Sequence, residues 1–137
     1  MKIIVTGTCG FIGFHVTKKL LDLNYNVIGI DNINNYYDIK LKKDRLKILL
    51  KHKNFKFIKQ DITNYKNLDK IFRYYKPKTV YHLAAQAGVR HSLKSPEDYV
   101  KSNLIGFFNI LHLSKEVRVN HLLFASTSSI YGDQTKM

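Results

Sequence analysis

The sequence predicts an α/β domain built on a doubly wound parallel sheet, and three features lead to this prediction. Short β-branched apolar runs alternate with longer amphipathic segments, a pattern typical of parallel strands connected by helices. Gly7, Gly10 and Gly13 stand between the first apolar run and the first amphipathic segment. Asp31 ends the second apolar run, 18 residues after Gly13, where a strand of such a sheet should finish.

The first half of the chain contains two expected strands and two expected helices. Residues 2–6 hold an apolar run too short for a helix and closed at once by glycine, which favours a buried parallel strand. Residues 11–24 are amphipathic and should form a helix, and residues 26–31, NVIGID, should form the second strand. After a polar loop at 32–38, a lysine-rich helix is expected over about 39–51, with one apolar side made by Leu41, Leu46, Leu49 and Leu50.

The alternation continues in the second half. Three further strands are expected at 56–59 (KFIK), 79–85 (TVYHLAA) and 121–126 (HLLFAS). The helix before the fourth strand should end at Pro77, and its apolar residues recur at helical spacing at Leu68, Ile71, Phe72 and Tyr75. The next helix should begin at Ser95-Pro96 and run to about residue 117, with one face made by Val100, Leu104, Phe107, Phe108 and Leu111.

The expected strand order makes the fifth strand an outer one. A doubly wound sheet of this type orders its strands 3-2-1-4-5-6, and the 137 residues supply no sixth run. An apolar unpaired edge is a liability for a free protein. We therefore expect residues 1–137 to form a single incomplete domain, the front part of something longer, with no second domain in this chain.

Composition indicates a globular protein. The chain has 137 residues, of which 45% are hydrophobic and 12% aromatic, enough for one domain with a real core. No apolar run approaches the roughly 18 residues of a membrane span. A core strand beginning at residue 2 leaves no room for a signal peptide. With one cysteine, Cys9, no internal disulfide is possible, and we expect a reducing, cytoplasmic setting.

The net charge of +13 has two interpretations. Nine of the 23 basic residues fall between Lys40 and Lys59, with Asp44 as the one acid there. A nucleic-acid surface is one meaning of such a cluster. The other is a compositional preference for Lys, Asn, Ile and Tyr spread over solvated faces, and this is favoured because no nucleic-acid motif accompanies the charge.

The glycine-rich turn is a candidate anion site. A strand, a tight turn and a helix place the first N–H groups of the helix, and the positive end of its dipole, at the turn. Side chains at Gly7 or Gly10 would fill space that a pyrophosphate needs, and one at Gly13 would hold the helix off the strand. Asp31 suits the ribose hydroxyls of NAD and would repel a 2′-phosphate. Since the spacing is G-x-x-G-x-x-G, a glycine turn without a ligand is the alternative.

Other candidates lie where the expected strands end, because ligands of open α/β sheets bind there. Asp61 could accept from an adenine amino group or cap the next helix. The small residues of Ala84–Gly88 would let backbone approach a cofactor, or form a plain tight turn. Asn103 could bridge two loops or lie on the surface. The hydroxyls of Ser126–Ser129 could meet a substrate, although such runs also fill loops.

Histidine and cysteine suggest no further chemistry. The six histidines lack metal-ligand spacing, so no metal site is expected. His82, within the fourth strand, is interpreted as a packed core residue rather than a base. Cys9 is interpreted as a small residue that fits the glycine turn.

Five blocks of this sequence, TGTCGFIG, GIDNINNYYD, HLAAQAGVRHS, SNLIGFFNIL and FASTSSIYG, resemble the extended short-chain dehydrogenase/reductase family. The first block is shared by nearly all extended members. The second and third are narrower and resemble nucleotide-sugar epimerases acting on uronic acids, the UDP-glucuronate 4-epimerases. The resemblance covers all 137 residues, which in that family form the front part only.

The resemblance implies a Rossmann-type fold, bound NAD and a UDP-sugar substrate, UDP-glucuronate or UDP-galacturonate. Hydride would leave the sugar C4, giving a 4-keto intermediate, and return to its other face. The base of such enzymes is the tyrosine of a Tyr-x-x-x-Lys pair, expected beyond the turn that contains Tyr131. Because the sequence has no such pair there, the chain alone should not catalyse epimerisation.

The resemblance also assigns residues. It implies a catalytic role for Thr127. The positions that match cofactor contacts are Gly7, Gly10, Phe11, Ile12, Gly13, Asp31, Asn32, Asp61, Ile62, Leu83, Ala84, Ala85 and Asn103. Those that match the substrate side are Gln86, Arg90, Ser128 and Ser129.

Two alternative functions and the oligomeric state stay open at this point. The chain could belong to another NAD-dependent nucleotide-sugar enzyme, a dehydratase or decarboxylase. It could also be a non-catalytic dinucleotide-binding module. A homodimer through the helix that contains Phe107 and Phe108 is possible in the resembled family, and the same helix could instead pack wholly on its own sheet.

Overall fold

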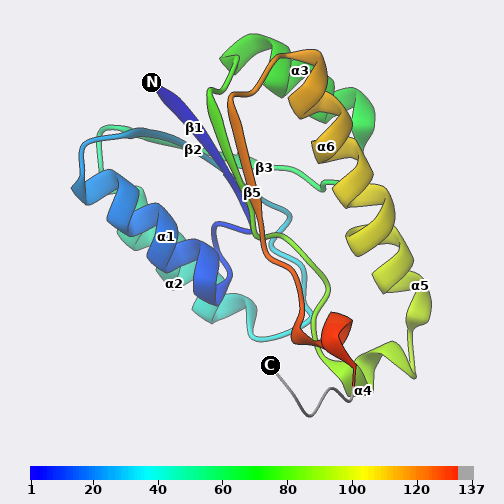
Figure 1. The fold of residues 1–137 in the computed structure, drawn as a ribbon. Helices are drawn as coiled ribbons and strands as arrows, with labels where there is room; N and C mark the ends of the chain where they lie inside the picture. Colours follow the sequence, from blue (N-terminus) through cyan, green and yellow to red (C-terminus); the bar gives the residue numbers. More distant parts are fainter. Residues whose placement is uncertain (133–137) are drawn as a thin grey trace.

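The computed structural model describes residues 1–132 and contains one five-stranded parallel sheet (Figure 1). Its strand order is β3-β2-β1-β4-β5, and each neighbouring pair is parallel. The strands are β1 (Lys2–Thr6), β2 (Asn26–Asp31), β3 (Phe55–Lys59), β4 (Thr79–His82) and β5 (His121–Phe124). The doubly wound order expected for the five runs is therefore confirmed, with β5 at the edge of the described sheet.

Helices cover both faces of the sheet. The helices are α1 (Phe11–Asp22), α2 (Ile39–Leu49), α3 (Tyr65–Tyr75), α4 (Val89–Ser92), α5 (Pro96–Tyr99) and α6 (Phe107–Glu116). A π-helical segment, Val100–Gly106, joins α5 to α6, and a 3₁₀ turn spans Ser128–Tyr131. Figure 1 shows α1 and α2 on one face and α3 and α6 on the other, so the fold has three layers.

Each layer of helices encloses its own core. Successive side chains of a strand point to opposite faces, and β1 accordingly sends Ile4 to one core and Ile3 and Val5 to the other. The α3/α6 side is completed by Ile28, Ile30, Ile62, Leu68, Phe72, Val80, Ile110 and Leu113. The α1/α2 side is completed by Phe14, Leu20, Leu21, Val27 and Leu49. Burial on both faces explains why the run Ile3–Val5 within β1 is continuously apolar rather than alternating.

Strand β4 ends three residues before the expected end of its run. After His82 the backbone leaves the ladder, and the N–H groups of Leu83 and Ala84 donate to Oγ1 of Thr6 at 3.1 and 3.2 Å. Leu83 N–H also donates to the Thr6 carbonyl, at 3.2 Å, so it is at Ala84 that the side-chain acceptor takes over and the segment turns over Gly7. The predicted strand over 79–85 is therefore wrong for its last three residues, which form part of a loop.

The apolar side predicted for α2 is wrong for two of its four leucines, since Leu46 is half-buried. Leu49 is fully buried, whereas Leu41 and Leu50 are about half exposed. Lys42 is buried instead, because its stem packs under the loop at 32–38 while its ammonium group finds polar partners. Leucine spacing alone did not reveal which turn of the helix faces the sheet.

The predicted long helix before β5 runs from Pro96 to Glu116 as expected but contains a π-helical segment, and the face expected from its apolar residues is exposed except at Phe107, which is half-buried. Leu104 and Phe108 keep 65% and 59% of their surface, and Val100 and Leu111 are also exposed. The residues that face the sheet are Gly106, Asn109, Ile110, Leu113 and Ser114. A π-helical turn holds more residues than an α-helical turn, so the residues after it are rotated away from the positions that a continuous helix would give them.

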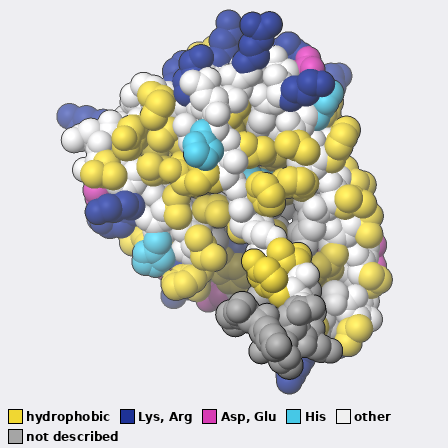
Figure 2. Space-filling model, in the orientation of Figure 1, with side chains coloured by type: hydrophobic (Ala, Val, Ile, Leu, Met, Phe, Trp, Pro, Cys, Tyr) yellow, Lys and Arg dark blue, Asp and Glu magenta, His cyan; other side chains and the backbone are white. Residues whose placement is uncertain are grey.

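One surface of the described chain is rich in apolar side chains. Figure 2 shows them gathered on the side on which β5 and α6 lie in Figure 1. Leu123 and Phe124 of the edge strand are 37% and 54% exposed. Among residues 1–132, no helix is long and apolar enough to cross a membrane.

Candidate functional site

A cleft lies where β1, β2 and β4 end, at the carboxyl edge of the sheet. It encloses about 630 Å³, including its open mouth. The predicted site residues that line it are Gly7, Gly10, Asp31, Asn32, Asp61, Ile62, Leu83, Ala84, Ala85 and Gln86. It is also lined by residues that sequence analysis did not single out, among them Asn34, Tyr36, Tyr37 and Lys42. The cleft is also lined by Ser102, so the fold brings together residues up to 95 positions apart.

The three glycines of the turn serve different purposes. Gly7 has a φ of +71°, and a Cβ there would lie 2.7 Å from the backbone N of Ala84. A Cβ at Gly13 would lie 1.9 Å from the carbonyl O of Gly7. These two glycines are needed for close contacts within the protein. Gly7 lets the loop after β4 approach the turn, and Gly13 lets α1 pack against the turn, rather than against the strand as predicted. Gly10 is different, because its Cβ would meet only Gly7 O, at 3.1 Å.

Helix α1 begins directly at this turn. Its N-cap is Gly10, with no side-chain cap and no acidic residue in the first turn. The first N–H groups of a helix have no intrahelical acceptor, so this end can bind an anion. Phe11 and Ile12 are more than half exposed, and they do not line the cleft. Their predicted contribution to a cofactor site therefore rests on their backbone N–H groups.

Asp31 organises the loop that follows β2. Its carboxylate accepts from the N–H groups of Cys9 and Ile33 at 2.9 and 2.8 Å, and only 8% of the residue is exposed. A carboxylate has further lone pairs that remain available for ribose hydroxyls. Burial, and next the negative charge of Asp31, raise the pKa of the Cys9 thiol to about 12. Cys9 is thus a buried neutral thiol, as its interpretation as a small packing residue requires.

Two cations from α2 approach the same end of the cleft. Lys42 donates to the backbone and side-chain oxygens of Asn34 and lies 4.4 Å from the centre of the Tyr37 ring. Burial lowers the pKa of Lys42, and Asp31 opposes this shift. Arg45 donates to Cys9 O at 3.3 Å and to the Tyr37 hydroxyl at 3.1 Å. Sequence analysis missed both residues because they lie within a long basic run.

Asp61 does not cap the helix after β3. Its Oδ1 accepts from both the N–H and the hydroxyl of Thr63, and its Oδ2 accepts from Asn32 at 2.7 Å. Asn64 caps α3 instead. Burial raises the pKa of Asp61, but the hydrogen bonds from Thr63 and Asn32 outweigh burial, so the pKa lies below its usual value. Asp61 therefore links the ends of β2 and β3 as an ionised acceptor.

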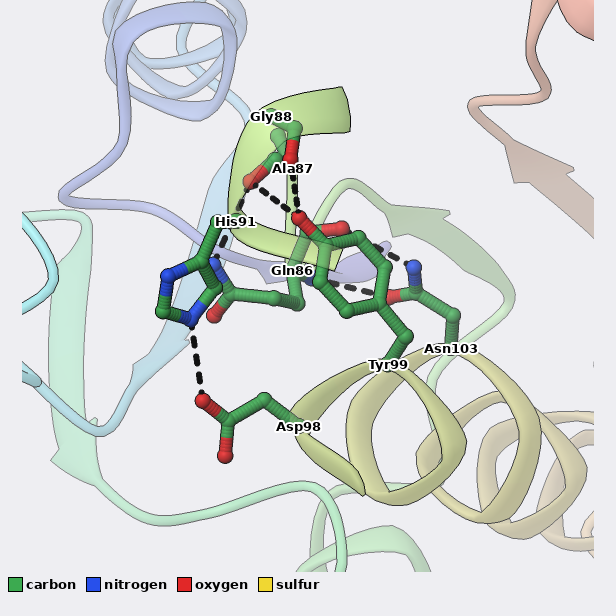
Figure 3. Close-up of polar contacts among 7 residues, drawn as sticks. All are labelled: Gln86, Ala87, Gly88, His91, Asp98, Tyr99 and Asn103. Carbon is green, nitrogen blue, oxygen red and sulfur yellow. Dashed lines mark hydrogen bonds and ion pairs between the residues drawn. The ribbon is translucent and has the colours of Figure 1, made fainter. Parts of the chain in front are cut away.

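The loop after β4 is held by side chains of the following helix, as Figure 3 shows. Asn103 accepts from Gln86 N at 2.8 Å and donates to Gln86 O at 2.9 Å. Asn103 is exposed, as in the surface alternative, but its side chain still holds the backbone of Gln86; it is not a buried bridge between two loops, and it does not itself line the cleft. Gln86 is 8% exposed and faces the cleft, whereas Arg90 is exposed and lies outside its lining.

Thr127 and His82 do not line the cleft. Thr127 is exposed, and its carbonyl accepts from Ile130 N at 3.4 Å. The predicted roles of the Ser128 and Ser129 side chains lie outside the described structure. His82 is 5% exposed, contacts Thr6 Oγ1 at 2.7 Å, and has a pKa lowered to about 4 by burial. This confirms its interpretation as a core histidine. Within residues 1–132, no cluster of potential metal ligands occurs.

Comparison with known proteins agrees with the sequence blocks. A family model described as GDP-mannose 4,6 dehydratase matches residues 4–137. The UDP-glucuronate 4-epimerase of Thermodesulfobacterium geofontis is 50% identical over 132 residues, which are 96% of this chain and 41% of that protein. A probable UDP-glucuronate 4-epimerase of Rhizobium meliloti is 45% identical over 137 residues, 100% of this chain and 40% of that protein.

Solved structures show the same fold. The UDP-glucuronic acid 4-epimerase of Bacillus cereus, in complex with UDP-glucuronic acid and NAD, superimposes with a TM-score of 0.90 at 37% identity. The match covers 99% of this chain and 43% of that one. This chain therefore spans about 40% of the length of the curated relatives that it matches.

Proposed function

Because the chain belongs to the family described as GDP-mannose 4,6 dehydratase, we propose that it is the NAD-binding part of a UDP-glucuronate 4-epimerase. The observation that carries the proposal is the cleft itself. It joins an uncapped helix N-terminus at Gly10, a nearly buried carboxylate at Asp31 and the small-residue loop Ala84–Gln86 along one edge of the sheet. These are the features that a dinucleotide needs at its pyrophosphate, its ribose and its second nucleoside.

Each part of the cleft fits a part of NAD. The turn at Gly10 and the first N–H groups of α1 would bind the pyrophosphate. Asp31 would accept from the adenosine ribose hydroxyls, and Asn32, Asp61 and Ile62 would border the adenine. Leu83, Ala84 and Ala85 would border the nicotinamide half, with Asn103 holding that loop through Gln86. When bound, the nicotinamide supplies the acceptor and donor of a hydride at the sugar C4.

The cleft should prefer NAD to NADP. Asp31 would repel a 2′-phosphate, and the two nearby cations already have partners: Asn34 for Lys42, and Cys9 O and the Tyr37 hydroxyl for Arg45. Within the described structure, neither Lys42 nor Arg45 donates a hydrogen bond to Asp31. We therefore propose NAD as the cofactor.

The substrate assignment rests on the named relatives and on the loops that carry the resemblance. Gln86, which lines the cleft, is proposed to face the substrate, and Arg90 with Ser128 and Ser129 is proposed to complete that side. The Thr127 hydroxyl is proposed to donate to the substrate oxygen at C4. The Tyr-x-x-x-Lys pair would have to come from outside these 137 residues, so we propose that the chain alone is catalytically inactive.

A fusion protein tests the substrate and the reaction together. Residues 1–132 would be joined to the remaining part of the Bacillus cereus relative, and sugar nucleotides would be separated after incubation with UDP-glucuronate. We expect UDP-galacturonate from the fusion and none from the chain alone. A fusion that binds NAD but releases carbon dioxide or a dehydrated sugar would support the decarboxylase or dehydratase alternative instead. One that binds NAD and converts nothing would contradict the proposal.

A homodimer is proposed as the assembly. The exposed apolar residues Val100, Leu104, Phe108 and Leu111 share one side of the helix before β5 and would be covered by the same helix of a second copy. Sedimentation velocity should give a dimer that Phe108→Glu converts to a monomer. A monomeric wild-type chain would contradict this assembly and leave the cofactor assignment intact.

A further inference from the structure

The segment Gln86–Ser92 is held by polar contacts rather than by core packing. Helix α4, which occupies its second half, has four residues and none of them is buried. The contacts come from the helix that follows, as seen in Figure 3. The Tyr99 hydroxyl donates to the carbonyls of Ala87, at 2.8 Å, and Gly88, and the Asp98 carboxylate accepts from His91. The position of the segment therefore depends on these side chains.

The His91 side chain contacts Asp98 and Tyr36, and its ring centre also lies 6.1 Å from that of Tyr99. Its Nε2 lies 3.0 Å from Oδ2 of Asp98, and because a carboxylate can only accept, Nε2 carries the proton. The opposite contact is with Tyr36, whose ring centre lies 4.9 Å from that of His91 at an interplanar angle of 61°. Edge-to-face pairs of this separation are attractive. One imidazole thus joins α5 to the loop that follows β2.

Tyr36 makes this contact from the cleft. It lines the cleft on the Asp31 side, while Gln86 lines it on the other side. The Tyr36 hydroxyl oxygen lies only 2.3 Å from the position that a Cβ of Gly88 would take, and Gly88 has a φ of +99°. The loops that follow β2 and β4 are therefore in contact with each other at Tyr36, Gly88 and His91, in addition to lining the same cleft.

We propose that His91 is a positioning residue that ties the two cofactor loops together, through Tyr36 on one side and Asp98 on the other, and thereby slows release of the bound dinucleotide. This inference rests on the proposed NAD site. His91 itself does not line the cleft, so it acts through Tyr36 and through the segment that carries Gln86. Loss of the tie should let the loops separate more often, which raises the dissociation rate constant more than it changes the association rate constant.

The test measures dissociation of NADH from the full 137-residue chain by stopped-flow fluorescence, with excess NAD as the displacing ligand. His91→Ala removes these contacts and should raise the dissociation rate constant about three- to tenfold, the range expected for one partly exposed hydrogen bond to a carboxylate with one ring contact. Asp98→Asn replaces the hydrogen bond to a carboxylate by a weaker one to an amide, and His91→Phe removes it; both keep the Tyr36 contact, so both should give smaller increases, the larger of the two for His91→Phe. Glu97→Gln removes a negative charge from the same turn without touching His91 and should stay within about twofold of wild type.

A double-variant cycle identifies the tie itself. Tyr36→Ala and Asp98→Asn should be non-additive in the dissociation rate constant, because both act through His91. Additive effects would show that the two contacts are independent and would overturn the proposal, as would unchanged dissociation in a folded His91→Ala chain. If that variant does not fold, the His91→Phe and Asp98→Asn rates decide, and wild-type rates in both would overturn it. A wild-type chain that binds no NADH would overturn the proposed cofactor site and this inference together, whereas normal binding with unchanged rates would overturn only this inference.

Discussion

Gly10 and Gly13 lie in the same turn, but their substitution should affect different properties. A Cβ at Gly13 would lie 1.9 Å from Gly7 O, so Gly13→Ala forces the helix and the turn apart by at least about 1 Å. Overpacking of this kind costs about 1–3 kcal/mol, and the gain of replacing a helical glycine by alanine, about 0.5–1 kcal/mol, offsets part of it. We expect a net loss of about 1–2 kcal/mol, seen as a melting temperature lower by roughly 3–8 °C.

Gly10→Ala should leave the fold stable and weaken cofactor binding. Gly10 has φ and ψ of −70° and 173°, which alanine adopts readily, and its Cβ would have only one tight contact, at 3.1 Å. The unfolding free energy should therefore change by less than about 1 kcal/mol. Because Gly10 lines the cleft, the added methyl group should reduce NAD affinity at least about tenfold.

Thermal melting and calorimetric titration of both variants against wild type separate the two effects. A Gly13→Ala chain as stable as wild type would refute the packing argument. A folded Gly10→Ala chain that binds NAD with wild-type affinity would refute the placement of the pyrophosphate.

Three further predictions concern buried polar groups. His82 has a pKa lowered to about 4, so it stays neutral in the folded chain, whereas it takes up a proton below pH 6.5 in the unfolded chain. The unfolding free energy, measured with urea, should therefore fall by about 3 kcal/mol between pH 6.5 and 4. His82→Asn should remove this pH dependence, and the control His15→Asn, at an exposed site, should keep it. Cys9, with a thiol pKa of about 12 and no exposed surface, should resist iodoacetamide at pH 8 until the chain is unfolded, and rapid labelling of the folded chain would contradict its burial. Thr6→Val should destabilise the chain by about 2–4 kcal/mol because it leaves His82 without its partner and the N–H of Ala84 without its acceptor, while Leu83 keeps the Thr6 carbonyl; Thr6→Ser should cost less than half as much.

The fold could be predicted from the sequence where local pattern and sheet geometry agree. The apolar run Ile3–Val5 indicated a strand buried on both faces, as it is in the structure. The alternation of strand and helix patterns indicated parallel neighbouring strands, and the strand order of a doubly wound sheet followed from that. The helix before β5 could not be predicted in the same way. Its π-helical segment changes the number of residues per turn, and no residue type in Val100–Gly106 predicts that change.

The site could be predicted where it consists of strand ends, because the topology brings those ends together. Asp31, Asp61 and the Ala84–Gln86 loop lie along one cleft for this reason. Contacts made by long side chains from other elements were not predictable. Lys42 reaches the cleft from a helix whose leucines suggested a different inward face, and Tyr99 reaches the Gly88 carbonyl across a loop of irregular backbone.

The central claim is that the cleft beside Asp31 binds NAD. Calorimetric titration of the 137-residue chain with NAD and NADP, repeated with Asp31→Asn, tests it most directly. We predict saturable binding of one NAD per chain, weaker binding of NADP, and a smaller difference between the two cofactors in the variant, because the carboxylate that repels a 2′-phosphate is gone. A folded chain that binds neither dinucleotide, or one whose preference Asp31→Asn leaves unchanged, would contradict the claim.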